Sequence, residues 1–514
     1  MQLGFSIPIQ NDEQEPHFNH YLGHGSPQWS NWDGGKIGGR PSWLNPRDIP
    51  REILRCRGPC GGTPLCFVTQ LYCPADDVGE SAFHRSLYVF ACPKCCSSTS
   101  SLIDSTKNAS DDNNAESKTC NLSECIKVLR CQLPKKNDFY PIKGDTSDSK
   151  WIKHTSSYWA QQSNDQLNLC AVCGQRSKGK CPKQDKWFCC PDHQKEYLRA
   201  TKKATNANHI SLKHLPSVCY ESELVVEEEP QPSLSATNNT DLQQEAKSSL
   251  FQSAEITDAD VTLEQSDLNA LTGNSALATA ATGVTDPTSL AFYARMAMGG
   301  EENDVRDQCL RYSRWPEMQG LDGEEQEDDG ENEGPLWLSS DNRPPTQLEQ
   351  MDKPTFPPPC QYCGAPRSFE FQILPQMLHY LFLDPESSSD DSEAKASHVL
   401  TESESAILLE ARSKIESGVD LPPGFREEHE KAVAKAREAL LGVSIGKKNG
   451  SDGAMDTLEW GTIAIYTCTQ SCGEGDVVTV EDVKDPCQSN EEKERLVSLG
   501  AYREEAAWMQ PPLD

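Results

Sequence analysis

The sequence predicts an α+β, β-rich protein with a pseudo-duplicated, zinc-stabilised core, an inserted zinc finger and acidic disordered segments. Three observations predict this class. The cysteines gather in three clusters with the spacing of metal ligands. The clusters nearest the two ends resemble each other. Between the clusters, the composition becomes acidic and poor in apolar residues.

Composition and charge exclude several functional classes. The 514 residues contain 22 cysteines, and 48 Lys and Arg against 79 Asp and Glu give a net charge of −31. This charge disfavours direct binding of nucleic acid unless a local basic patch overrides it. No window has the roughly 18 consecutive apolar residues of a membrane span, and the first residues lack the features of a secretory signal. In a reducing compartment, clustered cysteines indicate metal ligands and not disulfides.

The N-terminal half, residues 1–145, contains the first predicted zinc site. CRGPCGGTPLCFVTQLY begins at Cys56, and LYVFACPKC ends in a second group of cysteines. Zn²⁺ prefers four soft ligands in a tetrahedron, and a Cys-x3-Cys turn supplies two of them while a returning strand brings the other pair. The predicted ligands are Cys56, Cys60, Cys92 and either Cys95 or Cys96. A closed four-cysteine site of this kind is structural and not catalytic.

The C-terminal cysteines repeat this arrangement within residues 287–380 and 458–514. CQYCGAPRSFEFQILPQ aligns with the first motif so that Phe67 falls on Phe369 and Gln70 on Gln372. IAIYTCTQSC likewise resembles LYVFACPKC, because an apolar run ends directly in a cysteine pair in both. These coincidences predict a duplication and a second closed zinc site. Its predicted ligands are Cys360, Cys363, Cys468 and Cys472.

The middle cluster, within residues 165–220, reads CAVCGQRSKGKCPKQDKWFCCPDHQ and resembles a MYND-type zinc finger, in which interleaved ligand pairs hold two zinc ions. The first of these sites comprises Cys170, Cys173, Cys189 and His193. The second is less complete, because Gln184 stands where a cysteine is expected; its candidate ligands are Cys181, His214 and Cys219, with Cys190 as a further candidate. MYND fingers bind proteins, commonly proline-containing peptides, so the resemblance implies an interaction module; a purely structural finger also fits.

Secondary structure follows from periodicity and composition. β-Branched and aromatic runs predict strands at 67–72, 87–90 and 463–467, and a helix is expected at 372–383. Residues 221–286 are expected to be a disordered linker and 384–457 an acidic insertion. Within that insertion, apolar spacing predicts helices at 403–417 and 426–442, with solvated linker as the alternative.

No catalytic motif is present, so we do not expect an enzyme. The sequence lacks a P-loop, a serine elbow and a His-Glu-x2-His motif. His84 is expected to be a core histidine, and the glycine-rich run 34–40 is expected to be a turn that leads Trp43 and Leu44 into the core. The five cysteines outside the clusters (120, 125, 131, 309 and 487) are expected to be small buried residues.

Several ordered blocks carry a family resemblance. They include KIGGRPSWL, AFHRSLYVFACPKC, VLRCQLPKKNDFY, QCLRYSR and EWGTIAIYTCTQSC, in addition to the cysteine motifs above. Together they resemble the programmed cell death protein 2 family, which includes the fungal ribosome-maturation factor called 20S rRNA accumulation protein 4. The resemblance implies a zinc-binding, dedicated chaperone for a basic small-subunit ribosomal protein, the eukaryotic relative of bacterial small-subunit protein five.

The implied place of action is the cytoplasm, with the nucleus as a second compartment, in 40S subunit biogenesis and 20S pre-rRNA maturation. An acidic chain suits a basic client, because opposite charge steers the encounter. The alternative is a MYND-type protein-interaction scaffold in transcription regulation or in the control of cell death and proliferation.

Overall fold

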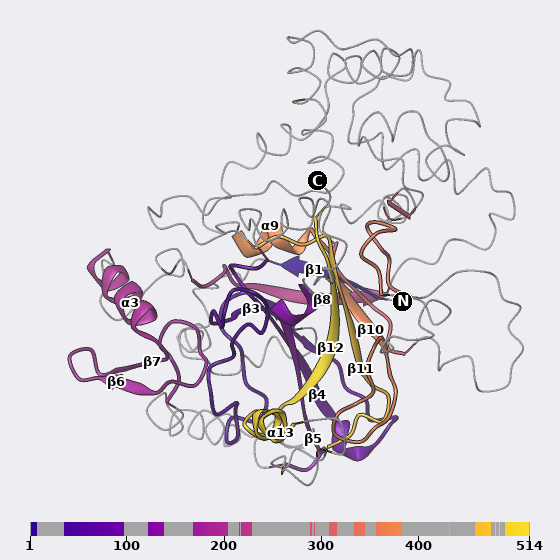
Figure 1. Cartoon of the computed structure of the whole chain (residues 1–514), viewed down its shortest axis with the longest axis horizontal. Coiled ribbons are helices and arrows are strands. Elements are labelled where there is room, and N and C mark those ends of the chain that lie inside the picture. Colours follow the sequence, from indigo (N-terminus) through magenta and orange to yellow (C-terminus); the bar gives the residue numbers. More distant parts are fainter. Residues whose placement is uncertain are drawn as a thin grey trace, which may run out of the picture.

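Ten strands rich in apolar residues pair edge to edge and close into a barrel (Figure 1). The computed structural model describes residues 2–7, 35–96, 122–137, 168–203, 217–228, 308–315, 334–344, 356–382, 458–473 and 489–512, besides a few isolated positions. In sheet order the barrel strands are β1 (Gln2–Ile7), β8 (Ser222–Glu228), β2 (Gly35–Ile37), β3 (Cys66–Tyr72), β4 (His84–Ala91), β5 (Ile126–Leu133), β12 (Arg503–Gln510), β11 (Thr462–Cys468), β10 (Arg367–Ile373) and β9 (Gln308–Tyr312).

Short helices and one hairpin complete the described elements. The 3₁₀ turns η3 (Glu80–Ala82) and η5 (Leu122–Cys125) precede β4 and β5, and α9 (Met377–Phe382) and α13 (Asn490–Val497) lie at opposite ends of the barrel (Figure 1). Beside the barrel, β6 (Gly179–Cys181), β7 (Lys186–Phe188) and α3 (Pro191–Lys203) form a separate small unit. No helix among the described residues is long and apolar enough to cross a membrane.

The barrel can be divided into two half-barrels, each with four strands that are consecutive in both the chain and the sheet, β2 to β5 and β9 to β12. We call β8-β2-β3-β4-β5 the first half-barrel and β1-β9-β10-β11-β12 the second. They meet where β5 pairs with β12 and where β1 pairs with β8, both antiparallel. The N-terminal strand β1 therefore completes the half-barrel built from C-terminal residues, because its other neighbour is β9.

The two central hairpins have the same irregularity at the same place. In the β3–β4 pair Phe67 lies opposite Phe90, and the register shifts between Phe67 and Thr69. In the β10–β11 pair Phe369 lies opposite Tyr466, and the register shifts in the same way after Phe369. Each strand thus carries a β-bulge one residue after the matching phenylalanine, and a bulge bends and twists its strand.

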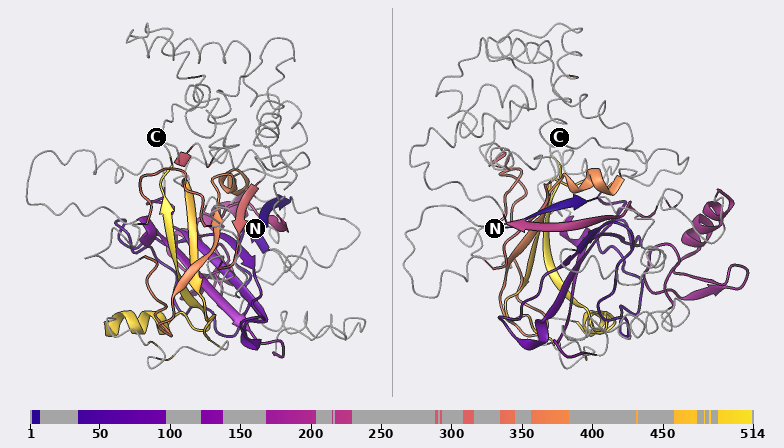
Figure 2. Two further views of the ribbon diagram at one scale, coloured as in Figure 1. Left: turned by 90° about the vertical axis from the view of Figure 1, so that its right-hand side faces the viewer. Right: turned by 180° about the vertical axis from the view of Figure 1, so that it is seen from behind.

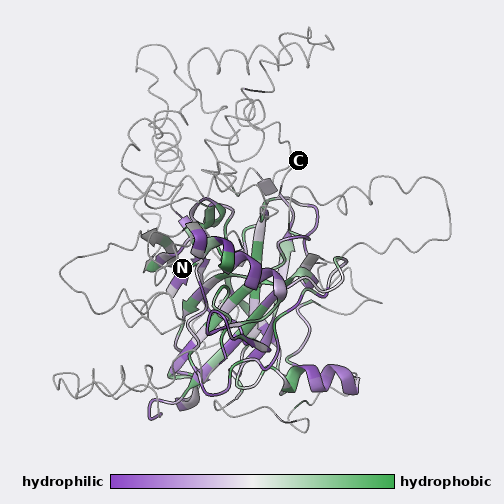
Figure 3. Cartoon of the chain, turned by 90° about the vertical axis from the view of Figure 1, so that its left-hand side faces the viewer, coloured by the Kyte–Doolittle hydropathy of each residue, from purple (hydrophilic) through white to green (hydrophobic). Residues whose placement is uncertain are grey.

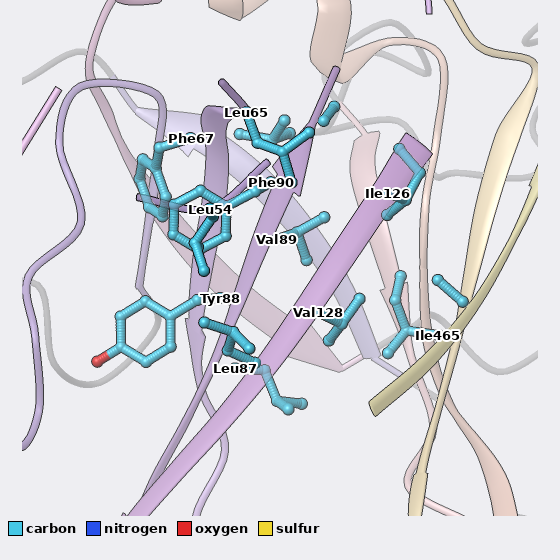
Figure 4. Packing of buried hydrophobic residues seen from close by; sticks show 14 of the residues in the cluster. Leu54, Leu65, Phe67, Leu87, Tyr88, Val89, Phe90, Ile126, Val128 and Ile465 are labelled. Atoms are coloured by element: carbon cyan, nitrogen blue, oxygen red, sulfur yellow. The ribbon is translucent and has the colours of Figure 1, made fainter. Parts of the chain in front are cut away.

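Strand β4 is buried on both faces (Figure 4). Leu87 and Val89 share a face with Arg85, which contacts the opposite wall of the barrel, so these side chains point into the barrel. Tyr88 and Phe90 alternate with them and stack on Trp43, with ring centroids 5.3 and 6.0 Å away. The segment around Trp43 and Leu44 therefore covers the outer face of this strand, as the sequence predicts for those two residues.

The barrel wall is not uniformly apolar. In Figure 3 the strands carry both hydrophobic and hydrophilic patches. The most buried polar contact is an ion pair between Arg85 of β4 and Glu370 of β10, with donor–acceptor distances of 2.5 and 2.7 Å and both side chains fully buried. Since β4 and β10 are not neighbours in the sheet, this pair crosses the interior and joins the two half-barrels.

The predicted elements agree with the structure in part. The three predicted strands are confirmed and extend to the bounds of β3, β4 and β11. The helix expected at 372–383 begins only at Met377, because Gln372 and Ile373 still pair within the sheet. The expected turn at 34–40 is present in part: strand β2 occupies residues 35–37 and pairs with β3 and β8, and Gly38 and Gly39, with φ values of 65° and 67°, form the bend after it.

Two further expectations concern the regions between the clusters. Strand β8 lies inside 221–286, so the first part of that predicted linker belongs to the barrel. Apolar and acidic residues alternate along β8, so the segment can be a strand although its composition is acidic. Leu224 is fully buried, whereas the glutamates beside it give the segment its acidic composition. The helices expected at 403–417 and 426–442 lie outside the described residues, apart from Lys431.

Candidate metal centres

The first cluster closes into a compact set of four thiols. Cys56 and Cys60 lie in the turn before β3, and Cys92 and Cys95 follow β4 directly. The Sγ atoms of Cys56 and Cys95 are 3.8 Å apart, and those of Cys60 and Cys92 are 3.5 Å apart. All four sulfurs lie within 4.8 Å of one another. Cys95, not Cys96, completes this set.

Backbone N–H groups support these sulfurs. The amide of Gly58 lies 3.3 Å from Sγ of Cys56, and the amide of Cys95 lies 3.4 Å from Sγ of Cys92. Such donors stabilise thiolates, which are the form that binds metal. A fifth thiol, Cys125, also hydrogen-bonds Cys56, and this contact raises the pKa of Cys56. Cys125 is buried, as expected, but its spacing gave no signal that it would adjoin the cluster.

The second half-barrel contains the corresponding set. Cys360 and Cys363 lie in a knuckle before β10, Cys468 ends β11, and Cys472 follows four residues later. The Sγ of Cys360 lies 3.6 Å from that of Cys472, and the Sγ of Cys363 lies 3.5 Å from that of Cys468. These four sulfurs also lie within 4.8 Å of one another.

Residues of the first half-barrel hold the loop that carries Cys472. Arg130 of β5 donates to the carbonyl of Cys472 at 2.9 Å and lies 3.7 Å from its Sγ. Gln132 donates to the carbonyls of Ser471 and Gly473. Hydrogen bonds from Cys360 and Cys468, together with Arg130, lower the pKa of Cys472. Residues of β5, on the other side of the β5–β12 boundary, therefore orient the second cluster.

The middle cluster forms the third set. Cys170 and Cys173 supply one knuckle, while Cys189 and His193 lie just before and within α3. The Sγ atoms of Cys173 and Cys189 are 3.7 Å apart, and Nδ1 of His193 lies 3.6 Å from Sγ of Cys170 and 3.0 Å from Sγ of Cys189. These four residues match the first predicted site of the finger.

The two Cys-x2-Cys-Gly knuckles have the same backbone geometry. In each, the glycine N–H donates to the carbonyl of the first cysteine, at 3.0 Å in Gly174 and 2.8 Å in Gly364. Both glycines have positive φ values, 68° and 79°. Other residues rarely adopt this conformation, so the glycine after the second cysteine allows the turn that brings the two sulfurs together.

The predicted second site of the finger is not assembled from the described residues. Cys181 in β6 contacts the side chain of Gln184, whereas Cys219 is buried in the main core and hydrogen-bonds Cys66 of β3. Cys190 packs against the apolar core of the finger, and His214 lies outside the described residues. Cys219 is separated from Cys181 because the chain has already returned to the barrel there, three residues before β8 begins.

The finger is anchored to the barrel by its knuckle. Arg40 donates to the carbonyls of Ala171 and Val172, both at 2.7 Å, and the indole of Trp43 donates to Gly174 at 2.9 Å. The side chain of Gln175 accepts from Leu54 and donates to Leu65. These contacts face the barrel, so α3 and the β6–β7 hairpin form the outer end of the finger (Figure 2).

The donor sets fit a tetrahedral zinc ion. A Zn–S bond of about 2.3 Å implies sulfur–sulfur separations of about 3.8 Å in a regular tetrahedron. Five Sγ–Sγ distances lie between 3.5 and 3.8 Å, close to this edge, and the ligand atoms of each group all lie within 4.8 Å of one another. Three Cys₄ or Cys₃His groups among the described residues can therefore hold a metal ion. His84, by contrast, is half-buried with Nδ1 3.0 Å from the Tyr72 hydroxyl and joins none of these groups.

Comparison with known proteins identifies the family. The model of the programmed cell death protein 2 N-terminal domain matches residues 26–147, and that of the C-terminal domain matches residues 301–417. The chain belongs to the programmed cell death protein 2 family. The first match contains the whole first cluster, while the second contains Cys360 and Cys363 but ends before Cys468. The finger lies between the two matched segments.

Individual relatives agree with this assignment. Programmed cell death protein 2 of Bos taurus is 28% identical over 357 residues, which is 68% of this chain and 80% of the relative. The protein of the same name from Rattus norvegicus is 26% identical, covering 69% of this chain and 82% of the relative. The human programmed cell death protein 2-like protein is 43% identical over a shorter stretch of 76 residues, 14% of this chain and 19% of the relative. No solved structure matches the chain.

Proposed function

We propose that the three clusters bind structural zinc ions. Each offers four soft donors at the spacing of a zinc tetrahedron, and a set of four protein ligands leaves no position for a substrate or a catalytic water. The ion would supply the cross-link that holds each knuckle to its returning strand or helix. This arrangement supports a non-enzymatic role, with zinc as the cofactor.

We also propose that the half-barrels arose by duplication and that residues 165–220 are a MYND-type finger inserted between them. The matched bulges after Phe67 and Phe369 support duplication, as does the placement of each cysteine pair beside the same hairpin. The Cys₃His set followed by α3 supports the finger assignment. The acidic insertions then extend from a folded core that the metal ions stabilise.

For the whole protein we propose a dedicated chaperone for a basic small-subunit ribosomal protein, the relative of bacterial small-subunit protein five. Family membership carries this proposal, since the ordered sequence blocks resemble a ribosome-maturation factor of that family. The net charge of −31 supports it independently, because an acidic protein attracts and neutralises a basic client before assembly. The place of action would be the cytoplasm, with the nucleus as a second compartment, during 40S biogenesis and 20S pre-rRNA maturation.

The test is affinity purification of the tagged full-length protein from actively translating cells. The chaperone proposal predicts strong enrichment of one small-subunit ribosomal protein together with its messenger RNA. Treatment with puromycin should remove that messenger RNA but leave the protein, because the drug releases the nascent chain from the ribosome. The tag alone serves as the control.

The alternative is a MYND-type scaffold in transcription regulation or in the control of death and proliferation. The outward position of α3 and the β6–β7 hairpin supports this function, because it leaves part of the finger open to partners such as proline-containing peptides. Enrichment of corepressor subunits without any ribosomal protein would support the scaffold and contradict the chaperone.

A further inference from the structure

A fifth thiol adjoins the first metal cluster. Cys125, the last residue of η5, hydrogen-bonds both Cys56 and Cys95, which form one edge of the four-cysteine set. A Cβ atom added at Gly58 would overlap Sγ of Cys125. The same point lies 3.4 Å from Sγ of Cys56 and 3.8 Å from Sγ of Cys95. The three sulfurs therefore surround one position, and a glycine there leaves room for all of them.

Backbone hydrogen bonds fix Cys125 in this place. Its carbonyl accepts from the amide of Cys92 at 3.0 Å, which binds it to the end of the returning strand. The preceding carbonyl, that of Glu124, accepts from the amide of Arg57 at 3.3 Å, next to Cys56 in the cysteine turn. The segment before β5 is thus held against both halves of the cluster, and it brings Cys125 close to Cys56.

The other buried cysteine of this part of the chain is placed differently. Cys131 lies within β5 and hydrogen-bonds the Tyr502 hydroxyl, not a member of a metal cluster. Both Cys125 and Cys131 are buried in the main core. Burial alone therefore does not explain the contact of Cys125 with two candidate zinc ligands.

The second barrel cluster has a different group at the corresponding place. The β4–β5 register, continued by one residue, puts Cys125 opposite Cys92. The β11–β12 register, continued by two residues, puts Glu504 opposite Cys468. The carboxylate of Glu504 is ion-paired with Lys127 at 3.1 Å. The two four-cysteine sets match each other, but only the first has a thiol at this position.

A zinc ion can exchange one thiolate ligand for another without any redox step. The Cys125 thiol would release its proton and bind the ion, while the Cys56 thiolate would leave the ion and take up a proton. The ion keeps four sulfur ligands throughout this exchange. Because Cys125 is fully buried, a sulfur and not water is the nearest donor on that side of the cluster.

We propose that Cys125 is a reserve ligand of the first cluster, able to take the place of Cys56 on the zinc ion. This inference rests on the proposed binding of zinc by that cluster. Its consequence is that the first site keeps its ion when Cys56 is lost, whereas the second site has no such substitute for Cys360.

The experiment measures the zinc content and the melting temperature of full-length variants. Cys56→Ala removes a ligand without supplying a new donor, and Cys56→Ala/Cys125→Ala removes the reserve ligand as well. Cys125→Ala alone shows whether the core tolerates the loss of that side chain. Cys360→Ala is the matched control, because Cys360 is the first cysteine of the second cluster and lies 3.6 Å from Cys472, as Cys56 lies 3.8 Å from Cys95.

We expect about three zinc ions in the wild type, in Cys125→Ala and in Cys56→Ala, but about two in the double variant and in Cys360→Ala. After cobalt substitution, Cys56→Ala should keep the thiolate-to-cobalt charge-transfer absorbance of the wild type, because the number of bound thiolates is unchanged. A double variant too unstable to purify would support the proposal in the same way, provided that both single variants fold.

Two results would overturn the proposal. In the first, Cys56→Ala loses an ion or fails to fold, as Cys360→Ala is expected to. In the second, the double variant keeps about three ions, because another donor would then complete the site. A wild type without zinc would overturn the zinc proposal as well, so the two failures are distinguishable.

Discussion

At the scale of single residues, the Arg85–Glu370 pair joins the two half-barrels across the interior. Both side chains are fully buried, and the hydroxyl groups of Ser471 and Thr467 bond to the pair. Burial would raise the pKa of Glu370, but the Arg85 guanidinium and the Thr467 hydroxyl hold it below its usual value. The carboxylate therefore remains charged inside the barrel, where it balances a guanidinium that cannot lose its proton.

Removing one charge of this pair should be costly. We expect Glu370→Gln to lower the free energy of unfolding by about 3–5 kcal/mol, because it leaves Arg85 buried without its counter-charge. The control is Asp77→Asn, which breaks a surface pair with Arg314 in which Asp77 is 61% exposed, and it should cost less than about 1 kcal/mol. Urea unfolding followed by tryptophan fluorescence measures both, and equal losses would contradict the buried-pair argument.

The same pair should make stability depend on pH. The pKa of Glu370 is lower in the folded protein than its usual value. Its contribution is therefore complete above the unfolded pKa of about 4.3 and is lost as pH falls towards the folded pKa. Accordingly, the difference in stability between wild type and Glu370→Gln should be constant near neutral pH and shrink below about pH 4. A difference that grows on acidification would contradict this sign.

At the scale of elements, the metal knuckles explain how short strands hold their positions. Each barrel cluster ties the turn before one strand to the end of its hairpin partner, at β3–β4 and at β10–β11. Metal binding contributes directly to folding in sites of this kind, on the order of 10 kcal/mol for structural zinc. The hydrogen bonds from Arg130 and Gln132 additionally join the second cluster to the first half-barrel.

Metal analysis should show whether the clusters bind zinc and, with a ligand variant, whether the second cluster holds one of the ions. Purified protein should contain about three zinc ions per chain if every cluster fills. Cys363→Ser should lose one ion and destabilise the protein by several kcal/mol, because it removes one ligand of a closed site. Cys309→Ser is the matched control, since Cys309 is a buried cysteine that belongs to none of the three groups. A stable Cys363→Ser protein with unchanged zinc would exclude the second site.

Arg130 offers a test of positioning without removal of a ligand. Arg130→Lys keeps the charge but removes the planar group that bonds Glu505, Gln132 and the Cys472 carbonyl together. We expect one of the three zinc ions to pass to a chromogenic chelator about tenfold faster than in the wild type. Unchanged release rates for all ions would show that Arg130 does not orient the second cluster. Arg51→Lys, at an exposed position, is the control.

At the scale of the whole molecule, the sequence predicts the repeated hairpins but not the closed barrel. The cysteine motifs and apolar runs locate β3, β4 and β11, because these carry local signals of spacing and burial. Strands β1 and β8 carry no such signal. The composition of β8 is that of an acidic linker, and β8 pairs with β1 through residues that are far apart in the sequence. The knuckle residues are likewise predictable from spacing, whereas Arg130, Gln132 and Cys125 reach the clusters only through the fold.

Strand β1 provides a prediction for the whole molecule. Deleting residues 1–8 should destabilise both half-barrels, because β1 pairs with β8 of the first and β9 of the second. We expect a loss comparable with the entire stability of a domain, about 5–15 kcal/mol, so the variant should be cleaved rapidly in limited proteolysis. Deletion of residues 240–280, outside the described residues, should leave the proteolytic pattern of the barrel unchanged. A resistant barrel without residues 1–8 would show that β1 is dispensable.

The position of β1 also sets an order of events during synthesis. Strand β1 is made well before its two neighbours, which end at residues 228 and 312, and β5 is made well before its partner, which ends at residue 510. At about 5–20 residues per second, roughly 15–60 s pass before both neighbours of β1 have been made. Until residue 228 has been made, its backbone groups can pair with neither of their neighbours in the barrel. The barrel therefore closes only after residue 510 has been made.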